Sequence, residues 1–326
     1  MVSGDGVVGP SEIQHHVPVL ADAVARIAAV QPGEVWVDCT LGFGGHSRLL
    51  LKDGARVIGL DQDEDARLRA ARTLEGFGQR VQIVEGNFAE LTKLLDALGI
   101  GRVDGILADV GVSSYQLDQA HRGFSFRLTG PLDMRMNQRQ ADTAETVLRR
   151  LEVPELIQVL REYGEEPFAK PIARRIHAWL KTTDAPTTAE LAECIASALP
   201  ARVRAKRNHH PATRTFQAIR IVVNDELGAL RRLLADGPLR LNPGGRILVI
   251  SFHSLEDRMV KRRFNDLAGR TPMQAPRRGL PPPTVSKPEF ELLSKRAIKA
   301  TQEECGLNPR ARSARLRGLR RLEAAA

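Results

Sequence analysis

The sequence predicts an α/β fold: a doubly wound, mostly parallel sheet with an all-helical domain inserted between its fourth and fifth strands. Three observations lead to this fold class. Short apolar segments typical of buried strands alternate with helical patterns from residue 34 to residue 108. This alternation stops between Tyr115 and Asp225, where helical patterns dominate. One further strand-like segment, 246–252, then follows the turn-forming residues 242–245.

The elements of the first part follow from hydrophobic spacing. A helix is expected over 16–30, where Val19, Leu20, Val24 and Ile27 recur at helical intervals. Strands are expected at 34–39, 55–61, 81–85 and 103–108, and helices at 64–75 and 89–98. Connections this short require right-handed crossovers, so the four strands should end at one edge of the sheet. Open α/β sheets bind their ligands at that edge.

The remaining elements define the domain organisation. Helices are expected at 143–151, 153–163, 168–180, 187–199 and 225–235, while 219–223 is an ambiguous strand. Two last strands are expected within 290–295 and 313–319, after a loop at 271–288 that is rich in Pro, Gly and Arg. We therefore predict a discontinuous domain of residues 1–114 and 221–326, and an inserted helical domain of residues 115–220.

A glycine-rich turn after the first strand indicates a cofactor site. The strand 35–38 leads into Gly42, Gly44 and Gly45, which lack Cβ atoms and let the backbone approach a ligand closely. The second strand ends in Asp61, and an acidic residue at this place suits the two hydroxyls of a ribose. Strand, turn and distal acid together predict an adenosine-containing cofactor.

The choice of cofactor depends on what the turn must hold. Dinucleotides bind Gly-x-Gly-x-x-Gly turns, but here Ser47 occupies the third glycine position. The upstream Asp38 suits a partly cationic ligand such as S-adenosylmethionine better than a pyrophosphate. A dinucleotide-dependent oxidoreductase and a tight turn without a ligand are the alternatives.

Other chemically active side chains follow the later strands. Asp109 ends the fourth strand, beside the reactive centre of a bound cofactor, and Phe88 follows the third strand, where it suits stacking on adenine. His253 lies in a polar turn after the fifth strand. No Gly-x-Ser-x-Gly elbow precedes that turn, so a nucleophilic triad is disfavoured. The histidines lack metal-ligand spacing, and we expect no required metal.

Bulk composition points to a polyanionic partner in a reducing compartment. Lys and Arg number 48 against 39 Asp and Glu, which gives a formal net charge of +9. Cys39, Cys194 and Cys305 form no paired motif, so a cytoplasmic location is expected. No apolar run approaches the roughly 20 residues that cross a bilayer, so no membrane association is expected.

Two basic segments predict a nucleic-acid surface. The first is a window that we interpret as a basic loop with a stackable phenylalanine. Its candidate RNA-binding residues are Arg202, Arg204, Lys206, Arg207, Arg214 and Phe216. The second segment is the C-terminal run Arg310, Arg312, Arg315, Arg317, Arg320 and Arg321. Two basic surfaces flanking a cofactor cleft favour RNA or DNA over a merely solvated face.

Several long and unusual motifs resemble one known family. The matching segments are 16–20, 38–47, Asp61, 109–118 (Asp-Val-Gly-Val-Ser-Ser-Tyr-Gln-Leu-Asp), 122–126, 130–136, 210–220, 251–258 and 308–313. They occur in order along nearly the whole chain. The chain resembles the bacterial 16S ribosomal RNA cytosine-N4 methyltransferases, the RsmH or MraW family.

The resemblance implies a class I methyltransferase fold with S-adenosylmethionine as methyl donor. It implies cofactor contacts at Gly44, Gly45, His46, Asp61, Phe88, Asp109 and Gln116. Its implied substrate is the exocyclic N4 of a decoding-site cytosine (cytosine 1402) in 16S ribosomal RNA within the small ribosomal subunit. Two residues depart from the family pattern: Tyr115 stands where many members have Pro, and Cys39 where many have Gly or Ala. Neither position is one of the implied cofactor contacts.

The expected reaction is direct in-line transfer of the methyl group to the amine. Asp109 or a nearby backbone carbonyl is the candidate acceptor of the amine N–H, and His253 is a weaker candidate. One alternative is a non-catalytic RNA-binding factor in ribosome assembly that keeps this fold. Another is a DNA amino-methyltransferase, although those enzymes carry an Asn/Asp-Pro-Pro-Tyr type turn where this chain has Asp-Val-Gly-Val. A monomer and a homodimer are both compatible with the sequence.

Overall fold

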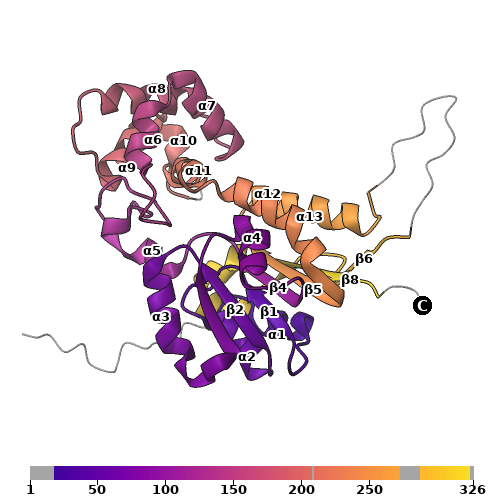
Figure 1. Ribbon diagram of the computed structural model, residues 1–326. Coiled ribbons are helices and arrows are strands. Elements are labelled where there is room, and N and C mark those ends of the chain that lie inside the picture. Colours follow the sequence, from indigo (N-terminus) through magenta and orange to yellow (C-terminus); the bar gives the residue numbers. More distant parts are fainter. Residues whose placement is uncertain (1–17, 208, 272–286, 324–326) are drawn as a thin grey trace, which may run out of the picture.

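The computed structural model describes residues 18–207, 209–271 and 287–323 (Figure 1). The start of the predicted helix 16–30 and almost all of the predicted loop 271–288 lie outside the described residues. Within the described parts, no helix is both long and apolar enough to cross a membrane.

The sheet has the predicted parallel core. Its strands lie in the order β3-β2-β1-β4-β5-β8-β6, and β7 pairs with β8. Neighbours from β3 to β5 run parallel, whereas β6, β7 and β5 are each antiparallel to β8. The strands span β1 Val35–Asp38, β2 Arg56–Asp61, β3 Val81–Glu85, β4 Val103–Asp109, β5 Leu241–Ser251, β6 Phe290–Leu292, β7 Ile298–Lys299 and β8 Arg315–Arg321.

Register places the polar strand ends together. Asp38 of β1 lies opposite Gly59 of β2 and Leu107 of β4, and Asp109 lies opposite Ile250 of β5. The carboxyl ends of β1, β2, β4 and β5 therefore form one edge, as the short connections predict. The start of β8 lies at the same edge, since this strand runs antiparallel to β5.

Helices cover both faces of the sheet, in agreement with the nearly continuous burial of residues along β1, β2, β4 and the end of β5. One face packs against α1 (Ala21–Ala28), α2 (Gly45–Lys52) and α3 (Glu64–Leu74). The other packs against α4 (Leu91–Ala97), α12 (Glu226–Asp236) and α13 (Ser254–Leu267) (Figure 1). Neighbouring residues of β5 serve opposite cores: Ile247 packs with α4, α12 and α13, and Leu248 with α1, α2 and α3.

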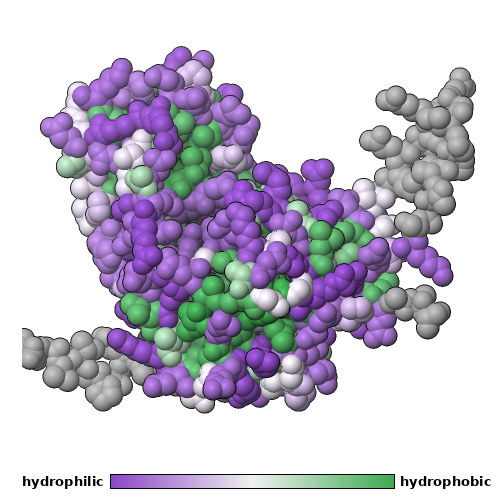
Figure 2. All heavy atoms as spheres, viewed as in Figure 1, coloured by the Kyte–Doolittle hydropathy of each residue, from purple (hydrophilic) through white to green (hydrophobic). Residues whose placement is uncertain are grey.

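The segment between β4 and α12 is helical and has its own core. Its helices are α5 Ser114–Asp118, α6 Ala144–Arg150, α7 Val153–Glu162, α8 Ala169–Leu180, α9 Thr188–Ser197, α10 Ala201–Ala205 and α11 Thr213–Asn224. Buried residues from Phe124 to Val223 form one apolar cluster separate from the two cores of the sheet. These helices stand above one end of the sheet, and their visible surface is mostly hydrophilic (Figures 1 and 2).

Three local expectations need correction. The ambiguous strand 219–223 lies in α11, because its apolar residues pack into the helical core. The turn 242–245 is part of β5, where the register shifts between Val103 and Gly105 of the neighbouring strand. The C-terminal part adds the short strand β7, and β8 lies inside the sheet between β5 and β6.

Candidate cofactor and substrate site

The glycine turn has the close-packed geometry that its composition predicts. Gly42 and Gly44 have φ values of 51° and 82°, in the left-handed region that favours glycine. A Cβ on Gly44 would lie 3.0 Å from the Leu74 side chain, and one on Gly45 would lie 3.3 Å from Pro18. The α2 helix starts directly after this turn, at Gly45.

Asp61 lies at the end of β2 and faces the glycine turn. Its Oδ2 accepts a hydrogen bond from the Gly42 N–H at 2.8 Å, and its Oδ1 accepts one from the Asp63 N–H at 2.9 Å. Each oxygen keeps a further lone pair for a ligand hydroxyl. Burial raises the pKa of Asp61 to about 6, and the two backbone hydrogen bonds only partly oppose this.

Asp38 stabilises the glycine turn through hydrogen bonds to residues on both sides of it. The Ser47 hydroxyl donates to Asp38 Oδ2 at 2.7 Å, and the Thr40 N–H donates to Oδ1 at 3.2 Å. Burial raises the pKa of Asp38 despite these hydrogen bonds. Ser47, which replaces the third glycine of a dinucleotide motif, therefore anchors the start of α2 to β1.

Asp109 and His46 provide polar atoms without protein partners. The Asp109 N–H donates to Thr40 Oγ1 at 2.7 Å, which fixes the end of β4 against the β1 turn. His46 Nε2 lies 3.5 Å from Asp109 Oδ2. Asp109 Oδ1 and both ring nitrogens of His46 are buried and have no hydrogen-bond partner among the described residues. Buried polar atoms of this kind are costly unless a ligand or water satisfies them.

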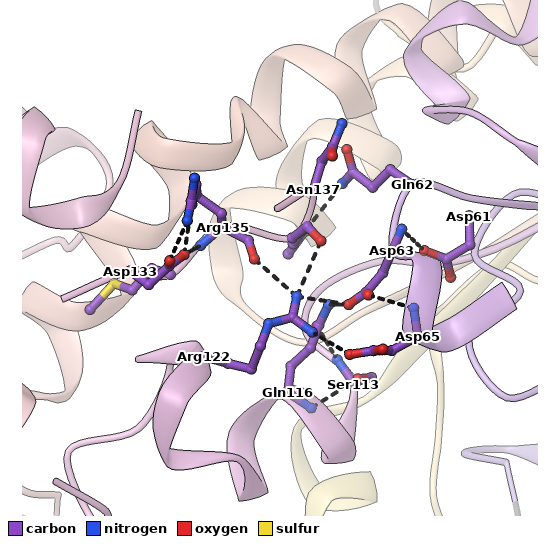
Figure 3. A network of polar contacts seen from close by, with 12 residues as sticks. Asp61, Gln62, Asp63, Asp65, Ser113, Gln116, Arg122, Asp133, Arg135 and Asn137 are labelled. Carbon is purple, nitrogen blue, oxygen red and sulfur yellow. Dashed lines mark hydrogen bonds and ion pairs between the residues drawn. The ribbon is translucent and has the colours of Figure 1, made fainter. Parts of the chain in front are cut away.

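A buried charged network that the sequence did not indicate lies next to Asp61 (Figure 3). Arg122 is fully buried, and its Nη2 donates to Asp63 Oδ2 at 2.8 Å and to the carbonyl oxygens of Arg135 and Met136. Asp63 in turn caps α3 by accepting from the Asp65 N–H. Residues 122–126 are one of the segments that resemble the family, but their spacing in the sequence gave no indication that Arg122 pairs with Asp63.

Gln116 belongs to this network. Its Oε1 accepts from the Ser113 N–H at 3.0 Å, and its Nε2 donates to Asp63 Oδ2 at 2.8 Å (Figure 3). The Ser113 hydroxyl completes a capping box at the start of α5. Protein groups thus engage both amide atoms of Gln116, one of the expected cofactor contacts.

The residues after β3 lie where the sequence predicts. Phe88 is half-buried at the edge of one sheet core. Asn87 caps the short helix that begins at Phe88, and its amide also donates to Gln62 Oε1 at 3.0 Å. Phe88 therefore follows a turn that is tied to the β2 end, next to Asp61.

His253 lies in a compact group of charged side chains after β5. Its Nε2 is 3.0 Å from Glu256 Oε1, and Glu256 Oε2 accepts from the Phe252 and His253 N–H groups. One ligand atom each from Glu226, His253 and Glu256 lies within 4.8 Å of the others. Both oxygens of Glu226 already pair with Arg220, which acts as the counter-ion.

The first basic window forms a hollow of about 570 Å³ in the helical part. Four predicted RNA-binding residues line it: Arg202, Lys206, Arg207 and Arg214. Arg207 pairs with the fully buried Glu166 at 2.6 Å, and Arg214 donates to the Glu165 carbonyl oxygen. Arg202 and Lys206 are exposed and pair with no acid within the described ranges.

Two interpretations of this window were wrong. Residues 213–217 belong to α11 instead of a loop. Phe216 is only 5% exposed and packs edge-on against Phe126 with ring centroids 5.1 Å apart, so it cannot stack on a base. Arg204 is exposed but does not line the hollow.

The C-terminal basic run is largely neutralised, which corrects the expected second positive surface. Arg310 pairs with Asp118, Arg315 and Arg317 share Asp257, and Arg320 pairs with Glu291. Arg321 donates to the Leu241 carbonyl oxygen. Of this run, Arg312 is exposed and has no acidic partner in the described segments.

The fold and site together define a class of protein. A parallel sheet carries a glycine turn, an acid at the end of β2 and a partner-free carboxylate oxygen at the end of β4, all at one edge. This is the arrangement of a class I methyltransferase, as the sequence predicts.

Comparison with known proteins identifies the family. A sequence model of the MraW methylase family matches residues 13–322, and the chain belongs to this family. It is therefore a methyltransferase, and S-adenosylmethionine is its methyl donor.

Curated relatives match over almost their full length. Ribosomal RNA small subunit methyltransferase H of Anaeromyxobacter dehalogenans is 51% identical over 313 residues, covering 94% of this chain and 98% of the relative. The protein of the same name from Syntrophotalea carbinolica is 48% identical over 316 residues, covering 95% and 99%.

Proposed function

We propose that this protein methylates the exocyclic N4 of a decoding-site cytosine in 16S ribosomal RNA of the small subunit. The names of the curated relatives support ribosomal RNA as the substrate. The observation that carries the chemistry is the buried, partner-free Oδ1 of Asp109 at the strand edge. Such a substrate also agrees with a cytoplasmic location.

The residues of the edge fit the proposed methyl donor. Asp61 keeps two acceptor sites for ribose hydroxyls, while Gly44 and Gly45 allow close approach of the backbone. Phe88 follows β3 and is half-buried, which supports a contact with the adenine. Asp38 and Asp109 make the pocket negative, which suits the cationic sulfonium and ammonium groups. S-adenosylmethionine supplies an electrophilic methyl group when bound.

The protein's part in the reaction is to position the amine. The N4 lone pair of cytosine is delocalised into the ring, so the amine is a poor nucleophile. Asp109 Oδ1 would accept an N–H hydrogen bond, orient the N4 lone pair, and take up the proton that N4 loses on methylation. Positioning of this kind lowers barriers by up to about 7–11 kcal/mol in favourable cases. His253, held by Glu256, contributes to the wall of the pocket.

The inserted helical domain, residues 115–220, recognises RNA in this proposal. Arg202 and Lys206 line a wide hollow and are free of acidic partners within the described chain, so they are available for phosphates. The target base must leave its stack to reach the sheet edge. In this proposal the hollow lined by Arg202 and Lys206 binds the RNA on either side of the target nucleotide while the target base is displaced from its stack.

Methyl transfer to small subunits from cells lacking this gene tests the proposal. We expect label from tritiated S-adenosylmethionine to enter 16S RNA, and mass spectrometry to place it on N4 of one cytosine. Asp109→Asn should lower kcat at least tenfold, because a neutral amide is a weaker acceptor.

The control is Asp96→Asn, since Asp96 is exposed on α4 and pairs only with Arg240. It should retain wild-type turnover. RNA binding without any methyl transfer by the wild-type protein would instead support the alternative of a non-catalytic assembly factor.

A further inference from the structure

The C-terminal segment forms a rim along the ligand edge of the sheet. The Leu20 N–H, just before α1, donates to Glu304 Oε1 at 2.6 Å. Further along the same segment, Arg310 pairs with Asp118 of α5 at 3.0 Å. Residues 301–313 therefore run from the neighbourhood of the glycine turn to the start of β8, next to the end of β5.

A small basic hollow lies where this rim meets β5. Its volume is about 120 Å³, and its lining includes His253, Ser254, Lys299, Arg312, Ser313 and Arg315. The hollow lies close to the end of β4, where Asp109 is. Phe252 lines the hollow, and a Cβ on Gly111 would lie 3.5 Å from the Phe252 side chain. In addition, the Val110 N–H donates to the Ile250 carbonyl oxygen. The hollow is thus one strand away from Asp109.

The charges around the hollow leave a positive surplus. Lys299 and Arg312 are exposed and form no ion pair with any residue in the described ranges. Arg315 and Arg317 share the single carboxylate of Asp257, at 2.8 and 2.7 Å. The other nearby acids are already engaged: Glu256 by backbone N–H groups and His253, and Glu165 by Ser254 and Arg258.

We propose that this hollow binds a backbone phosphate of the RNA next to the target nucleotide. Lys299 and Arg312 supply the cationic contacts, and the Ser313 hydroxyl lies in the same lining. The fourteen-residue helix α13 begins at Ser254, but Glu256 and Asp257 in its first turn offset the positive end of its dipole, so the cationic side chains provide the attraction. This inference rests on the proposed function, because it names a second substrate contact for the same reaction.

The hollow also joins the RNA surface of the helical domain. The Ser254 hydroxyl donates to Glu165 Oε2 at 2.7 Å, and Arg214, which lines the larger hollow, donates to the Glu165 carbonyl oxygen at 2.9 Å. Glu165 therefore links one lining residue of each hollow. One RNA strand held in both passes the end of β5, where the target base must enter.

The test compares two double variants that each remove two positive charges from the C-terminal segment. Lys299→Gln with Arg312→Gln alters the hollow. Lys295→Gln with Arg296→Gln is the control, since both residues are exposed and outside the lining. Binding of a short fluorescein-labelled single-stranded RNA is measured across salt concentrations, together with KM and kcat on small subunits and the affinity for S-adenosylmethionine.

We expect the hollow variant to weaken RNA binding about tenfold and to lower the salt slope by about 0.7 for each phosphate that the protein no longer neutralises. KM for small subunits should rise with kcat and S-adenosylmethionine affinity unchanged, because a bound phosphate stabilises substrate and transition state equally. Inorganic phosphate should compete with RNA in the wild type and less in this variant.

Equal RNA binding by the two double variants would overturn the phosphate site. So would binding of polyglutamate as tightly as RNA, since the hollow would then suit an acidic protein. Neither result depends on methyl transfer, so the failure of this site is distinguishable from failure of the proposed function, which shows as an absence of labelled 16S RNA with the wild-type protein.

Discussion

Asp61 combines two tasks that normally conflict. It holds the glycine turn through the Gly42 N–H and the start of α3 through the Asp63 N–H, yet it must keep acceptor capacity for a ribose. Burial raises its pKa to about 6, so its carboxylate is only modestly favoured at neutral pH. A small fall in pH therefore protonates a larger fraction of the Asp61 carboxylate, which is the proposed acceptor of the ribose hydroxyls.

This predicts a pH-dependent affinity for S-adenosylmethionine. The ribose hydroxyls donate to the ionised carboxylate, so binding should weaken as the pH falls below about 6, by up to about tenfold per pH unit. Asp61→Asn should bind S-adenosylmethionine weakly at every pH, because the amide N–H₂ would face one of the two backbone N–H groups that now donate to Asp61. The pH dependence of the affinity should vanish in this variant. Calorimetric titration from pH 8 to pH 5 measures both effects.

Glu85→Gln is the matched control for this experiment. Glu85 lies opposite Asp61 in the register of β3 but is half exposed and paired with Arg67 and Arg139. This variant should keep the wild-type pH profile. If wild-type affinity were constant down to pH 5, Asp61 would not be the ribose acceptor.

At the level of elements, Arg122 joins the cofactor edge to the helical insertion. Its guanidinium contacts Asp63 at the start of α3 and carbonyl oxygens of residues 135 and 136, which lead into α6 (Figure 3). All three hydrogen bonds come from Nη2, whereas Nε and Nη1 are buried without a hydrogen-bond partner among the described residues, so the Asp63 counter-charge is essential to hold this arginine in the interior. The Asp63 N–H donates to Asp61 Oδ1, so the position of Asp63 also affects Asp61.

Removing Arg122 should therefore damage both stability and cofactor binding. Arg122→Met leaves Asp63 as an uncompensated buried charge, and we expect a loss of about 3–5 kcal/mol in the free energy of unfolding, measured with urea. Affinity for S-adenosylmethionine should also fall. Adding Asp63→Asn removes that charge and should recover part of the stability. No recovery in the double variant would indicate that Arg122 acts mainly through packing.

Sequence patterns located elements and strand ends better than they located side-chain partners. The strands ending in Asp38, Asp61 and Asp109 were predictable, because apolar runs and turns are local signals. The burial of Phe216 against Phe126 was not, because the two residues are 90 positions apart and meet only in the folded insertion. Arg315 and Arg317 looked like a positive surface until the fold brought Asp257 beside them.

For the whole molecule, the net charge of +9 is less informative than its distribution. Several arginines of the two basic segments are paired with acids, whereas Arg202, Lys206 and Arg312, which pair with no acid in the described part of the chain, line two hollows. Glu165 contacts one lining residue of each hollow. The salt dependence of RNA binding should therefore reflect a few residues instead of the total charge.

The larger hollow allows a direct test of this distribution. Arg202→Gln with Lys206→Gln should weaken RNA binding about tenfold and reduce the salt slope, with S-adenosylmethionine affinity unchanged. Arg174→Gln with Lys181→Gln removes the same charge from exposed positions on α8 and at its C-terminal end, outside the hollow lining, and should change RNA affinity less than about twofold. Equal effects of the two pairs would show that total charge governs binding.

The position of β8 has a consequence for synthesis. This strand lies inside the sheet, although it is the last to be translated, and Glu304 reaches a residue 284 positions earlier. A nascent chain halted before β8 lacks an interior strand of the sheet. Long-range pairing of this kind also folds slowly. Without residues 301–321 the chain cannot place β8 between β5 and β6 or make the Glu304 contact with Leu20, so the sheet stays incomplete until this segment joins it.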